Sequence, residues 1–244
     1  MQRRWLLVAL AGCFAGGGMA ETPSAVPVAD EAPATAPSIL LAETFHPGVD
    51  PAACWVSEKY DGVRAVWNGR ELRFRSGRRV PAPAWFTAAL PREPLDGELW
   101  LGRGRFDELS GIVRRAEPND ADWRNVKYLV FELPRAAGSF TERSERLRAV
   151  AAGVEWLQPV PQFRVADRHE LEARLAEVVR GGGEGLVLHR AQSLYSTGRS
   201  GDLFKLKPWR DAEAMVVGYE PGRGRLAGKV GALRLLTEDG KLFR

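Results

Sequence analysis

The 244-residue sequence is poor in cysteine and histidine and has no long apolar run. Its two cysteines, Cys13 and Cys54, are too few for a disulfide framework. No run reaches the eighteen or more apolar residues that a membrane-spanning helix needs, which argues against a helical membrane protein. His46, His169 and His189 show neither the spacing of a metal site nor a Ser-His-Asp arrangement, so we expect all three to be structural. The fold must therefore depend on ordinary packing of a core.

The N-terminus has the pattern of an export signal. Gln2-Arg3-Arg4 precedes an apolar stretch from Trp5 to Leu10, and small residues follow up to Ala20. We therefore exclude residues 1–20 from the fold and predict an exported, periplasmic protein. Leu10-Ala11-Gly12-Cys13 is also of the kind at which bacterial lipoproteins are cleaved and lipidated. The short apolar stretch before Cys13 favours simple cleavage near Ala20 over a lipid anchor.

A tether is predicted to follow the signal. Residues 21–38 are rich in proline and alanine and hold few large apolar side chains, so we expect a disordered linker. The formal net charge is +4, and Arg3 and Arg4 contribute two of these charges, so removal of the signal leaves +2. A positive protein suits a polyanionic partner, although so small an excess has weak diagnostic value.

Short strand patterns alternate with a few helical ones from Ile39 onward, which predicts an α+β fold. The helix expected at 168–180 has Asp167 and Glu170 as a capping box, and Gly181 to Gly183 end it. The other expected helices are 142–152, 106–115 and 84–90. The expected strands are 55–56, 63–67, 72–74, 99–101, 127–131 and 185–189.

Five short motifs occur in a fixed order along this fold. They are Lys59-Tyr60-Asp61-Gly62 within Ser57 to Arg64, then Asp96-Gly97-Glu98, Phe131-Glu132, Glu184-Gly185-Leu186-Val187 and Lys205-Leu206-Lys207. One such tetrapeptide alone would mean little. As a set, they supply an amine nucleophile, carboxylates suited to Mg²⁺ or Mn²⁺, and cations for a phosphate. In a strand, Lys205 and Lys207 would share one face while Phe204 and Leu206 occupy the other.

These motifs resemble the nucleotidyltransferase motifs of ATP-dependent DNA ligases, and the minimal secreted bacterial type called Lig E is the most similar. The resemblance runs from about Ile39 to the last residue and includes Arg75-Ser76-Gly77. It implies an adenylation domain at 39–211, built of antiparallel sheets with flanking helices, and the start of an all-β OB-fold domain at 212–244. Only about 33 residues follow Asp211, so this second domain is expected to be incomplete.

The resemblance assigns a role to each motif residue. Lys59 would attack ATP and carry AMP, with Asp61, Lys205 and Lys207 assisting. Glu184 would hold the catalytic metal, and Asp96 would support the metal site. The residues expected to bind the nucleotide or the nick are Glu58, Arg64, Arg75, Glu98 and Phe131. Phe131 as an ordinary core residue is the alternative for that position. Glu132 departs from the Asp that is frequent after the aromatic residue in this family.

The implied activity is sealing of nicked double-stranded DNA by a monomer that uses ATP and Mg²⁺ or Mn²⁺, in DNA repair, replication or recombination. Two alternatives remain open from the sequence. One is a catalytically impaired nucleic-acid-binding module, motivated by the incomplete second domain. The other is an RNA ligase of the same superfamily. Arginine outnumbers lysine by 29 to 6, so clusters of arginine carry little information about DNA contacts.

Overall fold

A computed structural model describes residues 35–208 and 213–244. The predicted signal at 1–20, Cys13 and most of the predicted linker at 21–38 lie outside the described residues. So does the predicted domain boundary at 211 and 212. Among the described residues, no helix has the length and apolar content needed to cross a bilayer.

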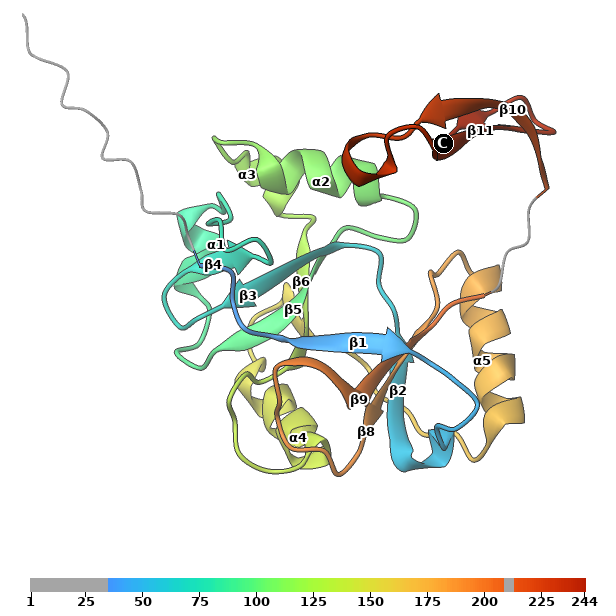
Figure 1. The fold of residues 1–244 in the computed structure, drawn as a ribbon. Helices are drawn as coiled ribbons and strands as arrows, with labels where there is room; N and C mark the ends of the chain where they lie inside the picture. The colour runs from blue at the N-terminus through green and yellow to red at the C-terminus, as the bar shows by residue number, and fades with distance from the viewer. Residues whose placement is uncertain (1–34, 209–212) are drawn as a thin grey trace, which may run out of the picture. The chain divides into compact units, whose positions relative to one another are not determined.

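The larger sheet has five strands and carries the main hydrophobic core. Its strand order is β4-β3-β5-β6-β7, and the pairs are antiparallel except for β6 and β7, which run parallel. Short helices α1 to α4 pack around this sheet (Figure 1). Its elements are β3 (Val63–Trp67), β4 (Leu72–Phe74), α1 (Ala84–Ala88), β5 (Leu95–Trp100), α2 (Phe106–Arg114), α3 (Asp120–Trp123), β6 (Lys127–Glu132), α4 (Phe140–Val150) and β7 (Leu157–Pro159).

The second sheet has four strands in the order β1-β9-β8-β2. Its edge strand β1 runs parallel to β9, whereas the other two pairs are antiparallel. One face packs against helix α5 around a smaller core that includes Val56, Leu188 and Phe204. Its elements are β1 (Leu40–Thr44), the 3-10 turn η1 (Pro51–Ala53), β2 (Cys54–Glu58), α5 (Arg168–Arg180), β8 (Leu186–Arg190) and β9 (Gly198–Leu206).

The helix predictions are close to the observed elements. Helix α5 spans the predicted residues, and Asp167 caps it by accepting from the backbone N–H of Glu170 at 2.9 Å. The expected reciprocal bond differs, because Glu170 accepts from Ala166 rather than from Asp167. Helix α4 begins and ends two residues earlier than predicted, and Ser139 and Glu142 form its capping box. Helix α3, a single turn capped by Asn119, was not predicted.

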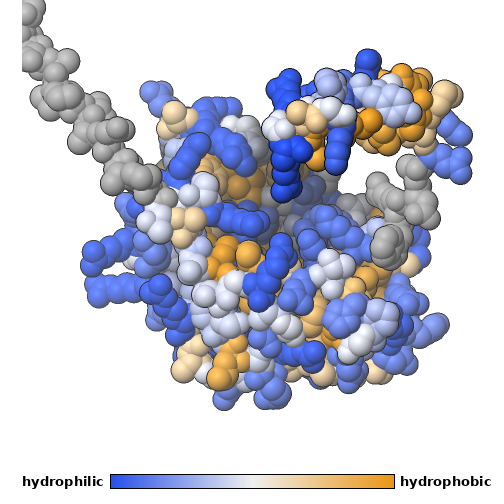
Figure 2. Space-filling model, in the orientation of Figure 1, coloured by the Kyte–Doolittle hydropathy of each residue, from blue (hydrophilic) through white to orange (hydrophobic). Residues whose placement is uncertain are grey.

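The last described residues form a small antiparallel sheet of three strands. These are β10 (Ala214–Pro221), β11 (Val230–Thr237) and β12 (Leu242–Phe243), with the 3-10 turn η2 (Gly224–Leu226) between the first two. Consecutive strands were predicted here. Large apolar side chains such as Met215 and Tyr219 are exposed on this sheet, and hydrophobic surface gathers over it in Figure 2.

Candidate active site

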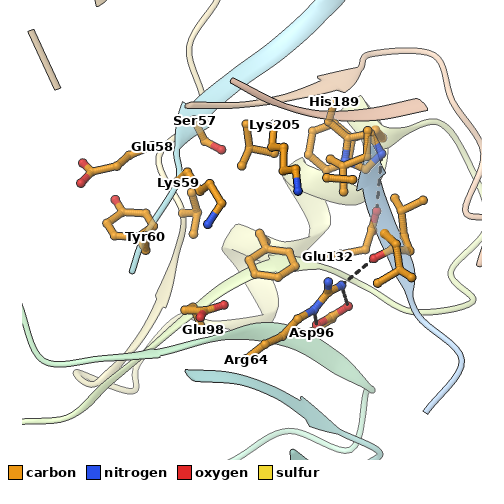
Figure 3. A pocket seen from close by; sticks show the side chains of 18 of the residues that line it. Ser57, Glu58, Lys59, Tyr60, Arg64, Asp96, Glu98, Glu132, His189 and Lys205 are labelled. Atoms are coloured by element: carbon orange, nitrogen blue, oxygen red, sulfur yellow. Dashed lines mark hydrogen bonds and ion pairs between the residues drawn. The ribbon is translucent and has the colours of Figure 1, made fainter. Parts of the chain in front are cut away.

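A cavity of about 350 Å³ lies between the two larger sheets. Figure 3 shows Lys59 and Lys205 reaching into it from β2 and β9, while Glu98 and Arg64 face them from β5 and β3. The structure thus brings together residues that are up to about 150 positions apart in the sequence. The predicted site residues that line the cavity are Glu58, Lys59, Arg64, Arg75, Asp96, Glu98, Phe131, Lys205 and Lys207.

Lys59 follows the last residue of β2 and is fixed at its backbone and at its side chain. Its N–H donates to the carbonyl of Gly185 at 2.8 Å, which continues the pairing between β2 and β8. Its ammonium contacts the carboxylate of Glu184, and Lys207 contacts the second oxygen of the same carboxylate. Burial disfavours the charged carboxylate, but the hydrogen bonds from Lys207 and Lys59 outweigh it and lower the pKa of Glu184. Glu184 is therefore an ionised bridge between two lysines.

Two glycines of the motifs allow these strands to approach closely. A Cβ at Gly62 would lie 2.3 Å from the carbonyl oxygen of Leu99 and 2.7 Å from Cγ of Glu98. A Cβ at Gly185 would lie 2.3 Å from the carbonyl oxygen of Leu206, and its φ of +155° lies outside the usual range of other residues. Any larger residue at either position would push apart the strands that carry the acidic and basic side chains.

Strand β9 directs its lysines into the cavity as the alternation of its residues predicts. Phe204 is buried in the core beneath α5, and Leu206 packs against the same cluster. Lys205 and Lys207 are on the opposite face and line the cavity. Lys207 itself follows the last residue of the strand.

Asp96 has a different environment from the one that the resemblance implied. Its carboxylate is fully buried and accepts two hydrogen bonds from Arg64, at 2.9 Å from Nε and 2.7 Å from Nη2. Burial raises the pKa of Asp96, and the charge of Arg64 opposes that rise. Arg64 also donates to the carbonyl of Leu40 on β1. Because both oxygens hold Arg64, this geometry makes Asp96 the residue that orients the guanidinium and does not favour the predicted contribution to a metal site.

Glu98 lies at the cavity wall, where its carboxyl group is shielded from bulk water. Burial raises its pKa to about 8, although the charges of Arg64 and Lys59 favour the ionised form. Because Glu98 binds a proton more tightly in the folded protein than in the unfolded chain, its contribution to the free energy of unfolding is complete below the ordinary pKa of 4.5. That contribution is lost as the pH rises through about 8. A pKa of about 8 leaves Glu98 largely neutral near pH 7.

Substitution of Glu98 with glutamine should flatten the pH dependence of stability, because glutamine stays neutral. Between pH 5 and about pH 9, the unfolding temperature of the wild type should fall more steeply than that of Glu98→Gln. Thermal unfolding followed by circular dichroism measures both slopes. Glu108→Gln is the control, since Glu108 is exposed on α2 and its pKa is lowered by Arg105. Equal slopes for the wild type and Glu98→Gln would contradict the assignment.

Phe131 is half-buried and belongs to the cavity wall rather than to the core. The guanidinium of Arg64 lies 5.3 Å from the centre of its ring. An aromatic ring with a cation nearby and open space beside it suits the stacking of a planar base. Arg75, in the turn after β4, is exposed and reaches the same cavity.

Two further predicted residues, besides Asp96, are not placed as expected. Asp61 lies in the turn after Lys59, is exposed, and is not among the residues that line the cavity. Glu58 borders the cavity, but both of its oxygens accept hydrogen bonds from Arg103, at 2.9 and 2.8 Å. In Figure 3 the carboxylate of Glu58 points away from Lys205 and the centre of the cavity. The geometry thus favours an ion pair for Glu58 over nucleotide binding.

A buried ion pair explains the glutamate that departs from the family pattern. Both oxygens of Glu132 accept from Arg143 of α4 at 2.8 Å, and Arg143 also donates to the carbonyls of Gly138 and Ser193. Burial raises the pKa of Glu132, and Arg143 opposes that rise. The pair ties β6 to α4 and to the loop after β8. It fixes the chain next to Phe131.

His189 also lines the cavity, and the sequence offered no signal for this position. Its ring stacks on Phe140 with centroids 3.7 Å apart. Its Nε2 is 3.9 Å from the nearer oxygen of Glu132, too long for a hydrogen bond. Burial, reinforced by the charge of Arg143, lowers the pKa of His189 to about 3, so the imidazole is neutral.

The described residues contain no group of three or more His, Cys, Asp and Glu that could hold a metal ion alone. Mg²⁺ is commonly held by one or two carboxylates together with the phosphates of a substrate. Glu184 is ionised and its side chain is 22% exposed, so it is the candidate carboxylate for such an ion, although Lys59 and Lys207 contact both of its oxygens in this structure.

Two sheets flank a cleft in which a lysine is held against a carboxylate, and together with the relatives and solved structures that follow, this arrangement identifies a nucleotidyltransferase. No protein-family model matches the chain. A DNA ligase of Haemophilus influenzae is 34% identical over 206 residues, which are 83% of this chain and 75% of the relative. A probable DNA ligase of Beutenbergia cavernae is 30% identical over 84% of this chain but only 43% of its own length. The chain belongs to the ATP-dependent DNA ligase family.

Solved structures agree with this membership. A structure from a study of Lig E DNA ligases, which concerns DNA binding with a minimal scaffold, is 38% identical with a TM-score of 0.79. It covers 86% of this chain, and the match spans 83% of that structure. The Chlorella virus DNA ligase–adenylate has a TM-score of 0.61 over 86% of this chain and 84% of its own, and at 20% identity it shows the fold alone.

Proposed function

We propose that this DNA ligase seals nicks in duplex DNA through an AMP carried covalently on Lys59. The observation that carries the proposal is the contact of the Lys59 ammonium with ionised Glu184 at the wall of a cavity rich in cations. The unprotonated amine of a lysine is a nucleophile toward a phosphorus atom, and the contact with Glu184 holds this lysine at the cavity wall. The relatives and the solved neighbours support the same chemistry.

The reaction proceeds in three transfers. The neutral amine of Lys59 forms a bond to the α-phosphorus of ATP and loses a proton, while the bond to the bridging oxygen breaks and pyrophosphate leaves with the electron pair. The 5′-phosphate at the nick then attacks the same phosphorus, and the nitrogen takes up a proton and leaves with the electron pair as the free amine of Lys59. Finally the 3′-hydroxyl attacks the 5′-phosphorus, loses its proton and displaces AMP.

Each cavity residue has a role in this sequence. Lys205 and Lys207 neutralise charge that accumulates on the α-phosphate in the transition state. Glu98 hydrogen-bonds the ribose hydroxyls, and Phe131 stacks on adenine. Arg64, held by Asp96, and exposed Arg75 bind phosphates of the nucleotide or of the nick.

A divalent metal completes the proposed site. Glu184 is the residue that would hold Mg²⁺ or Mn²⁺ together with the ATP phosphates. When bound, such an ion would supply charge neutralisation on those phosphates. The chain's own contribution is to keep Glu184 ionised and within reach of Lys59 and Lys207.

Replacement of Phe131 with leucine should weaken ATP binding about tenfold, because stacking of a base on an aromatic ring contributes roughly 1–3 kcal/mol. The half-saturating ATP concentration for adenylation should rise while the rate at saturation changes less. Stopped-flow or quench measurements over a range of ATP concentrations separate the two quantities. Phe74→Leu, in the core beside β3, is the control for loss of an aromatic side chain. An unchanged half-saturating concentration in Phe131→Leu would remove Phe131 from the adenine site.

Nick sealing tests the proposal directly. A duplex with one nick, a labelled 5′-phosphate and Mg²⁺ should be sealed with ATP, and the label should move into the longer strand. Parallel substrates with RNA on one or both sides of the nick distinguish a DNA ligase from an RNA ligase. Retention of the nicked duplex on a gel without sealing or adenylation would favour a binding module instead.

We also propose that the protein is exported to the periplasm, supported by the charged, apolar and small-residue pattern of residues 1–20. Expression of the full sequence in a Gram-negative host, followed by fractionation and mass measurement, tests this. Cleavage near Ala20 is expected. A mature chain that begins with a lipidated Cys13 would replace simple cleavage, and an uncleaved cytoplasmic chain would contradict export.

A further inference from the structure

Arg103 links the end of β2, next to the proposed nucleophile, to the glycine turn that follows α5. It lies in the loop between β5 and α2, and its Nε and Nη2 donate to the two oxygens of Glu58 at 2.9 and 2.8 Å. Its Nη1 donates to the carbonyl of Gly181 at 2.8 Å. Three separate parts of the chain therefore meet at one guanidinium.

The glycines after α5 leave the room that this arrangement needs. A Cβ at Gly181 would lie 2.4 Å from Nη1 of Arg103. A Cβ at Gly183 would lie 3.0 Å from an oxygen of Glu58 and 2.5 Å from Val178. The glycines from 181 to 183 therefore end the helix and also leave space for the side chains of the ion pair between Arg103 and Glu58.

The two segments that Arg103 joins carry the reacting amine and its carboxylate. Glu58 immediately precedes Lys59, and Gly181 lies three residues before Glu184. The segments meet a second time through the N–H of Lys59 and the carbonyl of Gly185. Arg103 itself is not among the residues that line the cavity, and its guanidinium is engaged by Glu58 and Gly181.

We propose that Arg103 is a positioning residue for the adenylation step, and that it acts by fixing Lys59 relative to Glu184. The inference rests on the proposed role of Lys59 as the nucleophile. Fixing the backbone on both sides of the site limits the displacement of the amine from the line of attack. Reaction rates fall steeply with such displacements, even when they are as small as about 1 Å.

The expected effect is on rate rather than on stability. The side chain of Arg103 is 38% exposed and that of Glu58 16%, and ion pairs near the surface contribute little to the free energy of folding. Removal of Arg103 should therefore leave the fold intact while Lys59 becomes less well placed.

Adenylation in the absence of DNA is the decisive measurement. In Arg103→Ala, the rate constant at saturating ATP should fall about tenfold, the size expected for an amine displaced by a fraction of 1 Å. The half-saturating ATP concentration should stay within about twofold of the wild type, since Arg103 is outside the cavity. Arg105→Ala is the matched control. Arg105 is in the same loop, but its ion pair is with Glu108 only three residues away, so its adenylation rate should not change.

A double-mutant cycle tests whether Arg103 acts through Glu58. Glu58→Gln should slow adenylation to a similar degree, and the double variant should be no slower than Arg103→Ala alone. Arg103→Lys, which keeps the charge but cannot bind both oxygens and Gly181 together, should be intermediate in rate.

Three results would overturn the proposal. If Arg103→Ala adenylates at the wild-type rate but binds nicked DNA more weakly, Arg103 is a phosphate contact instead. A change confined to the half-saturating ATP concentration would make it a nucleotide ligand. Additive losses in the double variant would exclude action through Glu58. Lys59→Ala, measured in parallel, tests the role of Lys59 separately from the role of Arg103. This variant keeps the ion pair between Arg103 and Glu58, so its failure to adenylate would support Lys59 as the nucleophile whatever Arg103→Ala shows.

Discussion

Replacement of Lys59 with alanine is expected to abolish adenylation and the sealing of ordinary nicks while sparing the last step of the reaction. The loss should reach roughly a millionfold or the limit of detection, the scale that follows removal of a covalent nucleophile. A nick that already carries AMP on its 5′-phosphate needs no amine, because the 3′-hydroxyl attacks that phosphate directly. Gel assays with ordinary and pre-adenylated nicks measure the two activities side by side.

Lys127→Ala is the matched control for Lys59→Ala. Lys127 is an exposed lysine at the start of β6, and it is not among the residues that line the cavity. Its activity on both substrates should equal that of the wild type. Sealing of ordinary nicks by Lys59→Ala would disprove the role of this lysine. Loss of both activities together with a lower unfolding temperature would indicate damage to the fold.

The largest effect on stability is expected from Arg143→Ala. Arg143 is only 1% exposed, and it donates to Glu132 and to the carbonyls of Gly138 and Ser193. Its removal leaves a buried carboxylate and two carbonyls without these donors, which should cost about 3–5 kcal/mol of unfolding free energy. Urea unfolding followed by tryptophan fluorescence measures this quantity.

Two variants make the Arg143 prediction specific. Arg146→Ala removes an exposed arginine from the same helix and should change the unfolding free energy little. The double variant Glu132→Gln with Arg143→Met removes the buried charge as well, so it should be more stable than Arg143→Ala. A double variant as unstable as the single one would show that the uncompensated buried charge does not dominate the loss.

Local patterns predicted most helices and several strands, but the strand expected at 99–101 begins earlier, at Leu95, and so includes Asp96 and Glu98. Helix α5 was predictable because Asp167 caps its start and Gly181 follows its end, and both signals act within a few residues. The alternation of Lys205 with Phe204 and Leu206 correctly assigned opposite faces of β9. Strand β1 was not predicted, because its parallel pairing with β9 joins residues more than 150 positions apart and leaves no local pattern.

The site was predictable in its residue types but not in its pairings. The ordered motifs singled out Lys59 and Glu98, which line the cavity, and Glu184, which contacts Lys59. The sequence did not show that Asp96 is occupied by Arg64, or Glu58 by Arg103, because each pair joins separate strands or loops. His189 was predicted to be structural, and its buried, neutral imidazole agrees with that prediction. Its burial depends on Phe140, which belongs to another element.

The most direct test of the account is to locate the AMP. The purified protein would be incubated with ATP and Mg²⁺ without DNA, digested, and its peptides analysed by mass spectrometry under conditions that preserve a phosphoramidate. The account predicts one AMP on the peptide that contains Lys59 and none on the peptides that contain Lys205 or Lys207. AMP on another lysine, or a protein that seals nicks without ever carrying AMP, would contradict it.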